Sequence, residues 1–150
     1  MSDGIHIRGS QLFRERTQEA LSLLSATKTF LSVKLFLSAI REGRMSYLHV
    51  SWGKTTFLVG YPTWQAPVIW YASGIVHEAG HGKLYREKRR RLFKLHFFNS
   101  GPHWAGTEAE RFCCRLQLAA LSELGAPEYM KRHVEALMEN PKYHLASPCW

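Results

Sequence analysis

The chain has 150 residues, 45% of them hydrophobic and 13% aromatic, which is enough to bury a core in one domain without disulfides or an obligatory structural metal. Its three cysteines cannot all pair within one chain, and two are adjacent, so the composition argues against a disulfide framework and favours a reducing compartment. The N-terminus shows no basic segment followed by an apolar one, and no uninterrupted apolar run reaches about 18 residues. We therefore expect a cytoplasmic protein, a single domain over 1–150, with no membrane segment.

The formal net charge of +8 is concentrated in one segment. Residues 83–94 include seven basic side chains and one glutamate, which gives +6 of that total. A basic cluster of this kind attracts phosphate or an acidic partner. One interpretation is therefore a nucleic-acid-binding module, and the other is a solvated helix end and loop. The basic residues concerned are Arg86, Lys88, Arg89, Arg90 and Arg91.

The first third of the chain predicts helices. Residues 1–9 carry two glycines and no periodic pattern, which indicates a loose leader. Apolar residues at helical spacing then predict a helix over 11–25, with Ser10 as its N-cap. The segment 30–40 mixes β-branched, aromatic and helix-forming residues, and we favour a helix that ends at Gly43 over a strand and turn.

A short sheet is predicted next. Apolar residues alternate with polar ones over 46–52, and β-branched and aromatic residues dominate 55–60. Gly53-Lys54 separates the two runs, so a β-hairpin is expected. The strand 55–60 would present an edge to which an extended peptide can add.

The following segment contains the motif with the clearest chemistry. An almost continuous apolar run over 66–76, with Pro67 in its first turn, predicts a buried helix that leads into His77-Glu78-Ala79-Gly80-His81. In a helix, His77 and His81 lie one turn apart on one face, a spacing at which two imidazoles can bind one divalent metal, with Glu78 beside them. Unpaired polar groups in a buried helix cost about 1 to 3 kcal/mol each, and a metal would supply their partner. Gly80 would let a neighbouring element approach closely, and Gly82 marks a possible kink.

A third protein ligand is needed, because a catalytic zinc has three protein ligands and one open position. Thr107 is the expected N-cap of a helix over 108–124 that Gly125 closes. At 100° per residue, Glu108 falls on the solvent face and Glu110 within the apolar arc, so we choose Glu110. Gln117 lies on the same arc, either as a hydrogen-bond partner of a ligand or as a plain buried amide.

The remaining residues complete the predicted fold. Cys113 and Cys114 are interpreted as small core residues. A last helix is expected over 128–139, followed by a loose tail over 141–150. Together the patterns predict a mainly helical α+β domain with a short hairpin or sheet next to the motif helix.

The His-Glu-x-x-His motif followed by a glutamate on a later helix resembles the gluzincin class of zinc metallopeptidases, in a minimal form that covers about residues 46 to 125. The resemblance implies that His77, His81 and Glu110 hold one zinc ion per chain. It also implies that Glu78 is the general base for a water that attacks a bond in a peptide or protein substrate. Larger gluzincins often carry an aspartate one turn after the glutamate ligand, and Cys114 stands there in this chain.

Two further expectations remain open. The segment Glu108-Ala109-Glu110-Arg111-Phe112-Cys113 is similar to the Glu-Ala-x-x-Phe-Ala helix of metallopeptidases that cleave bacterial repressors, which would make Glu108 the ligand instead. An inactive zincin with a structural metal is the other alternative. Candidates for a group that stabilises an oxyanion are His96, His103, Tyr129 and His133.

Overall fold

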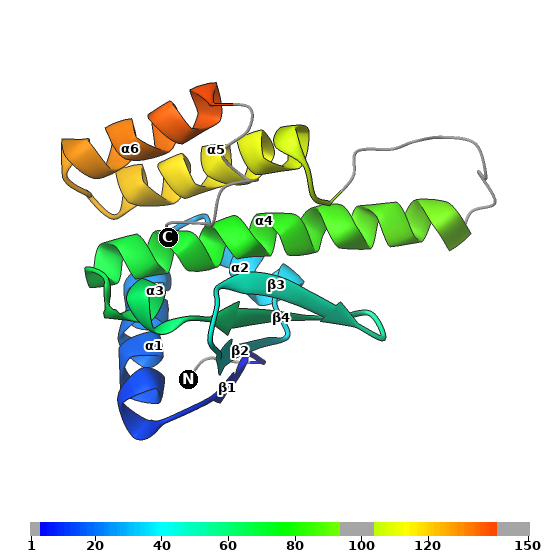
Figure 1. Ribbon diagram of the computed structural model, residues 1–150, viewed down its shortest axis with the longest axis horizontal. Coiled ribbons are helices and arrows are strands. Elements are labelled where there is room, and N and C mark those ends of the chain that lie inside the picture. The colour runs from blue at the N-terminus through cyan, green and yellow to red at the C-terminus, as the bar shows by residue number, and fades with distance from the viewer. Residues whose placement is uncertain (1–3, 94–103, 141–150) are drawn as a thin grey trace.

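The computed structural model describes residues 4–93 and 104–140, with the backbone alone for 91–93. A four-stranded sheet lies on one side of the long helix α4 (Val68–Phe93), and α5 (Thr107–Glu123) and α6 (Glu128–Glu139) lie on the other (Figure 1). Helices α1 (Gln11–Leu24), α2 (Phe30–Phe36) and α3 (Tyr61–Gln65) also contact α4. The prediction of a mainly helical α+β fold with a small sheet next to the motif helix is confirmed.

The sheet has the strand order β1 (His6–Arg8), β2 (Ala39–Glu42), β4 (Lys54–Val59) and β3 (Tyr47–Ser51). The predicted hairpin is confirmed, because β3 and β4 are antiparallel and adjacent. Its turn residues, Trp52 and Gly53, both have positive φ angles, 49° and 78°, as the tightest hairpin turns require. β4 pairs with β2 on its other side, so the expectation that residues 55–60 form an edge was wrong. The strand at that margin of the sheet is β3.

Two predictions about the N-terminal third were also wrong, and both errors have one cause. Residues 1–9 are not all loose, since His6–Arg8 pair in parallel with β2 as the strand β1. The predicted helix to Gly43 stops at Phe36, and Ala39–Glu42 form the strand β2 between β1 and β4. Both strands are held by partners distant in the chain, which local propensity cannot show.

The motif helix is one continuous element. The carbonyl of Pro67 accepts a hydrogen bond from the Tyr71 amide at 3.0 Å, and the helix then runs to Phe93 without ending at Gly82. A Cβ atom at Gly82 would lie 2.5 Å from the carbonyl oxygen of Phe36. The glycine therefore lets α2 approach α4 closely, and the helix continues through the position where a kink was expected.

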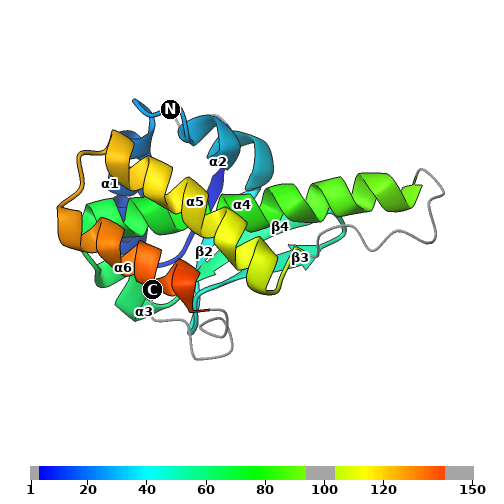
Figure 2. The same ribbon diagram turned by 90° about the horizontal axis from the view of Figure 1, so that it is seen from above.

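Residues 71–82 of α4 are buried around the whole circumference of the helix. The sheet with α1 and α2 covers one side, and α5 crosses the other with α6 alongside it, as the view from above shows (Figure 2). The buried hydroxyl of Tyr71 has a partner, Thr17 Oγ1, at 2.9 Å. A helix enclosed in this way explains the nearly continuous apolar run that precedes the motif.

Helix α5 begins with Gly106, not Thr107, as its N-cap. Gly106 has φ 101°, which favours glycine, and its carbonyl accepts a hydrogen bond from the Glu110 amide at 2.9 Å. The last helix has the predicted bounds, 128–139, and the predicted loose tail over 141–150 lies outside the described residues.

Candidate metal centre

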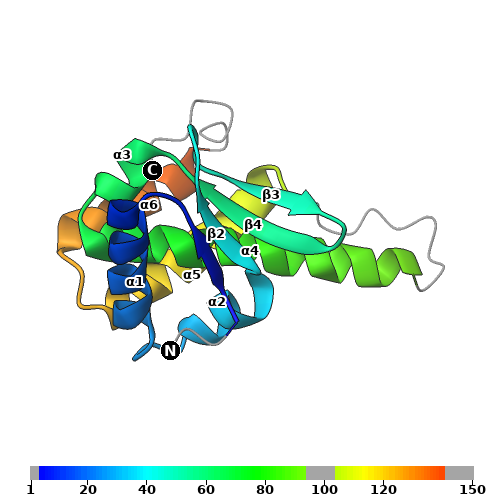
Figure 3. The same cartoon turned by 90° about the horizontal axis from the view of Figure 1, so that it is seen from below.

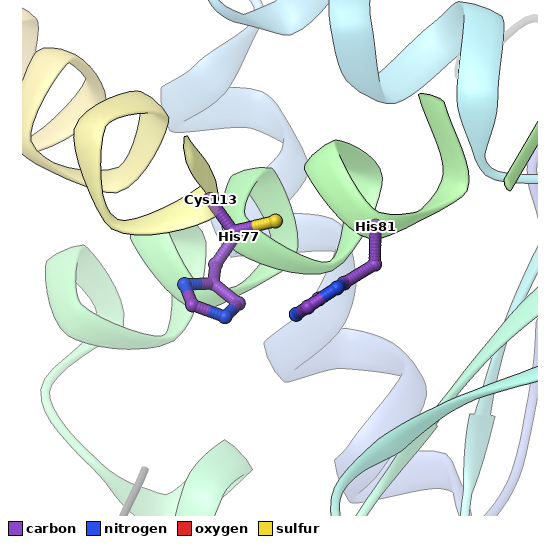
Figure 4. A group of neighbouring side chains, drawn as sticks. All are labelled: His77, His81 and Cys113. Atoms are coloured by element: carbon purple, nitrogen blue, oxygen red, sulfur yellow. The ribbon is translucent and has the colours of Figure 1, made fainter. Parts of the chain in front are cut away.

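The histidines of the motif lie on successive turns of α4 and face the same side. His77 is 0% exposed and His81 is 5% exposed, and their ring centroids are 5.1 Å apart. Figure 4 shows both rings projecting from α4, with Cys113 reaching towards them from α5. Two buried imidazoles this close need hydrogen-bond partners or a shared cation on their ring nitrogens.

A chain of side chains fixes the orientation of His77. The Ser73 hydroxyl donates to the Trp70 carbonyl at 2.8 Å, and the Gln117 amide nitrogen donates to Ser73 Oγ at 3.3 Å. The Gln117 oxygen therefore faces His77 Nδ1, 3.1 Å away, and must accept a hydrogen bond from it. The sequence left two roles open for Gln117, a hydrogen-bond partner of a ligand or a plain buried amide. In the structure its side chain is hydrogen-bonded to His77.

His81 is oriented by the backbone. Its Nδ1 donates to the carbonyl oxygen of Trp104 at 2.7 Å, so this nitrogen carries a hydrogen. Burial by itself lowers the pKa of His81, but the neighbouring side chains of Cys113 and Glu110 raise it by more, and the pKa lies well above its usual range.

Glu110 joins the two histidines. One carboxylate oxygen is 3.2 Å from His77 Nε2 and the other is 3.2 Å from His81 Nε2. Burial raises the pKa of Glu110, but the two imidazoles lower it by more, so it lies far below its usual range. Glu108 has the opposite environment, because its side chain is 77% exposed and pairs with Arg111 on the surface. Of the two candidate glutamates, the structure brings only Glu110 to the histidine pair.

The protonation of these groups indicates what the cluster can hold. Because each Nδ1 donates to an acceptor, the neutral form of each ring has a lone pair on Nε2. Both lone pairs then face a carboxylate, which in its ionised form is also only an acceptor. A proton on an Nε2 atom, or a cation among the three groups, would bridge such acceptors. Ligand atoms about 2.0 to 2.1 Å from a tetrahedral zinc lie roughly 3.3 Å apart, so the 3.2 Å from each Nε2 atom to the Glu110 oxygen that faces it is close to the spacing of two zinc ligands.

Glu78 is the fourth titratable group at this position. It follows His77 on α4 and is 5% exposed. Burial raises its pKa above the ordinary value, and the charges of His81 and His77 offset this only in part. A carboxyl group whose pKa is shifted towards neutrality beside a metal site is suited to exchange protons with a bound water.

Cys113 is the site residue whose position the sequence interpretation missed. It is fully buried, as expected for a small core residue, but its sulfur also lies within 4.8 Å of a ring nitrogen of each histidine. The available signal was its place three residues after Glu110, which puts both side chains on one face of α5. Burial raises the pKa of the Cys113 thiol, and the nearby His81 partly offsets that rise.

The other candidate residues lie elsewhere. Tyr129 and His133 line a separate hollow with Pro67 and Trp70, and His133 packs edge-on against Trp70. His96 and His103 lie outside the described residues. Of the described candidates, Tyr129 and His133, neither belongs to the group of His77, His81, Glu110 and Cys113.

The basic run forms the C-terminal part of α4. Arg86 donates to the carbonyl of Leu35 and lies over the ring of Phe36, and Arg89 lies against the hairpin turn at Gly53. Arg89 and Arg90 are both exposed. Arg86 thus packs against α2, whereas Arg89 and Arg90 give this end of α4 a basic surface.

The outer face of the sheet also carries a basic surface. No described helix covers this face (Figure 3), which has a hollow of about 450 Å³. We call it the basic sheet face, because its lining residues include Arg8, Arg41 and Lys54 together with His6 and His49, and no acidic residue among those described. Arg8 and Arg41 are neighbours across the parallel strands β1 and β2, where like charges destabilise a sheet.

Comparisons of this chain with protein-family models, with curated proteins and with solved structures found no match. None of the helices in the described ranges combines the length and the hydrophobicity needed to cross a bilayer.

Proposed function

We propose that this chain is a zinc-dependent hydrolase of peptide or amide bonds, with His77, His81 and Glu110 as the ligands of one zinc ion per chain. The observation that carries the proposal is the convergence of two Nε2 atoms and one carboxylate, with both Nδ1 atoms already engaged. Partners of this kind on the remote nitrogen are typical of metal-binding histidines, because they fix the ring orientation and the tautomer.

Zinc, when bound, would acidify a water molecule and polarise the substrate carbonyl. Glu78 is the residue placed to accept the proton of the attacking water and to pass it to the leaving amine. Gln117 and the Trp104 carbonyl hold the two imidazoles in the orientation that directs Nε2 at the metal. Metal binding, orientation of the imidazoles and proton transfer thus each have a proposed residue of this chain, whereas oxyanion stabilisation has none among the described residues.

The strand β3 is the best candidate for orienting an extended substrate. It lies at the margin of the sheet and also contacts α4, the helix that carries both histidines. A peptide added along β3 would have its main chain fixed by hydrogen bonds, a mode that recurs in peptide recognition. The edge available to a peptide is therefore β3 and not the strand over residues 55–60.

Hydrolysis can be tested without knowledge of the substrate. The zinc-loaded chain is incubated with a complex mixture of peptides, and new termini are identified by mass spectrometry. Cleavages that the wild type makes and the Glu78→Gln variant does not make support the proposal, since this variant keeps all three ligands. If the wild type and Glu78→Gln give the same peptides, the chain is not a hydrolase of this kind, and an inactive zincin with a structural metal becomes the better description.

The basic sheet face favours a second candidate function, the binding of single-stranded nucleic acid. Its paired Arg8 and Arg41 would contact phosphates, and the exposed Tyr47 offers a ring for base stacking. Retention of a single-stranded oligonucleotide should weaken in Arg8→Ala/Arg41→Ala, and its dependence on salt should become less steep. Arg90→Ala/Arg91→Ala tests the alternative surface on α4. If neither pair changes retention or its salt dependence, this candidate is wrong.

A further inference from the structure

The sulfur of Cys113 lies beside the histidine pair. It lies one turn after Glu110 on α5, is 0% exposed, and has its sulfur within 4.8 Å of ring nitrogens of His77 and His81 (Figure 4). A Cβ atom on Gly80, which lies between the histidines on α4, would be 2.9 Å from this sulfur. The gap left by the glycine is thus filled by the sulfur of Cys113.

The adjacent cysteine has a different environment. Both cysteines are 0% exposed, but Cys114 belongs to an apolar cluster between α5 and α6 that includes Leu121 and Met130, whereas Cys113 clusters with Leu84 and Ala109 and also faces the histidines. Neither cysteine forms a disulfide with another described residue. Two neighbouring buried thiols, of which only one lies at the histidine pair, provide a matched comparison within one helix turn.

We propose that Cys113 is a fourth protein ligand of the metal that His77, His81 and Glu110 bind. This inference rests on the proposed metal site. Zinc accepts thiolate, imidazole and carboxylate ligands together, and four protein ligands complete its tetrahedral coordination. With four protein ligands the metal would have no open position for water, so Cys113 would hold the site in a closed state. On this basis the chain has a latent metal centre, in contrast to the open three-ligand site that the sequence suggested.

The distances in the cluster are compatible with this coordination after a small contraction. A nitrogen about 2.0 Å and a sulfur about 2.3 Å from a tetrahedral zinc are roughly 3.5 Å apart. The separations among the two ring nitrogens and the sulfur are at most 4.8 Å. Because Glu110 is already 3.2 Å from both rings, the sulfur has to approach the nitrogens by reorientation of the Cys113 side chain and the imidazoles, with α5 staying in place.

Cobalt(II) provides a direct readout, because a thiolate bound to cobalt gives a charge-transfer absorption in the near ultraviolet that oxygen and nitrogen ligands do not give. The full chain is stripped with a chelator, loaded with cobalt(II), and compared with Cys113→Ser and Cys114→Ser. We expect the band in the wild type and in Cys114→Ser, and its complete loss in Cys113→Ser. The bound cobalt in Cys113→Ser should remain about one per chain, held by the other three ligands.

Each other outcome has a defined meaning. A wild type that binds cobalt without the charge-transfer band overturns the role of Cys113 and leaves the three-ligand site intact. A band that persists in Cys113→Ser, or disappears only in Cys114→Ser, also overturns it. If the wild type binds no cobalt, the proposed function fails along with this inference.

A second measurement needs no variant, in case Cys113→Ser does not fold. X-ray absorption at the zinc edge of the wild type should show one sulfur neighbour at about 2.3 Å together with nitrogen and oxygen neighbours at about 2.0 to 2.1 Å. A zinc with only the lighter neighbours contradicts the proposal. As a functional consequence, Cys113→Ser should hydrolyse any substrate of the wild type several-fold faster, since no sulfur then closes the site.

Discussion

The replacement Gly80→Ala should destabilise the protein, although alanine is the better helix former. By propensity alone, alanine stabilises a helix interior by about 1 kcal/mol relative to glycine. The new Cβ would lie 2.9 Å from Cys113 Sγ, 3.0 Å from Leu116 Cδ1 and 3.4 Å from Cys113 Cα. The sulfur is fully buried and the Cα atom belongs to the backbone, so α5 has to move away from α4. Overpacking of this kind costs about 1 to 3 kcal/mol, and we expect a net loss of about 1 kcal/mol.

Gly74→Ala is the matched control. Gly74 is a buried residue of the same helix, but a Cβ atom there would meet nothing within 4 Å. This variant has the higher helix propensity of alanine without a clash, so its free energy of unfolding should rise by about 1 kcal/mol. Urea unfolding of the metal-free proteins should therefore separate the two variants by about 2 kcal/mol. If Gly80→Ala were as stabilising as Gly74→Ala, α5 would not pack on α4 as described, and the geometry of the metal centre would be wrong.

Three further predictions follow from single contacts. Gln117→Leu should weaken zinc binding by about 10- to 100-fold, because His77 loses the acceptor for Nδ1, and an unchanged affinity by calorimetry would argue against this role. Thr17→Val should cost more free energy of unfolding than Tyr71→Phe, about 1 to 3 against 0.5 to 1.5 kcal/mol, because it leaves the buried tyrosine hydroxyl without its partner; the reverse order in urea unfolding would contradict this assignment. Glu78→Gln should stabilise the metal-free protein at pH 7. The folded-state pKa of Glu78 is raised, so the wild type loses stability as pH rises from the unfolded pKa, about 4.3, through the folded one. The gain should disappear near pH 4, and a gain of the same size at both pH values would mean that ionisation of Glu78 is not its cause.

The features that the sequence predicted correctly depend on local periodicity. The inward direction of Glu110 follows from its angular position on a helix, and the same argument places Glu108 in solvent, as found. The hairpin is specified by alternation around Gly53, and the last helix by a periodic run between turn residues. In each case a segment of fewer than twenty residues contains the whole signal.

The features that it missed depend on contacts between distant segments. The strands β1 and β2 pair with each other although α1 and α2 separate them in the sequence. Both strands are short, so neither has an alternating pattern long enough to recognise. Cys113 and Cys114 follow Glu110 by three and four residues, so helical spacing places either of them near Glu110 and does not separate the two. Only the crossing of α5 over Gly80 decides which sulfur meets the histidines.

The kink expected at Gly82 illustrates the ambiguity of a glycine within a helix. The same residue type can bend a helix or let another element approach it, and the pattern around Gly82 does not distinguish the two. In this fold the carbonyl end of α2 occupies the space that a side chain would need. Gly80 has the corresponding role on the side of α5, where close approach was the expectation.

Metal analysis of the full chain, purified without added metal, tests the central claim most directly. We predict about one zinc per chain, as expected for a site with three or four protein ligands. The affinity for zinc should fall in Glu110→Ala and stay unchanged in Glu108→Ala, because only the former side chain contacts His77 and His81. Glu78→Gln should also leave this affinity unchanged. A wild-type protein that contains no zinc and does not bind it tightly when zinc is supplied would contradict the account.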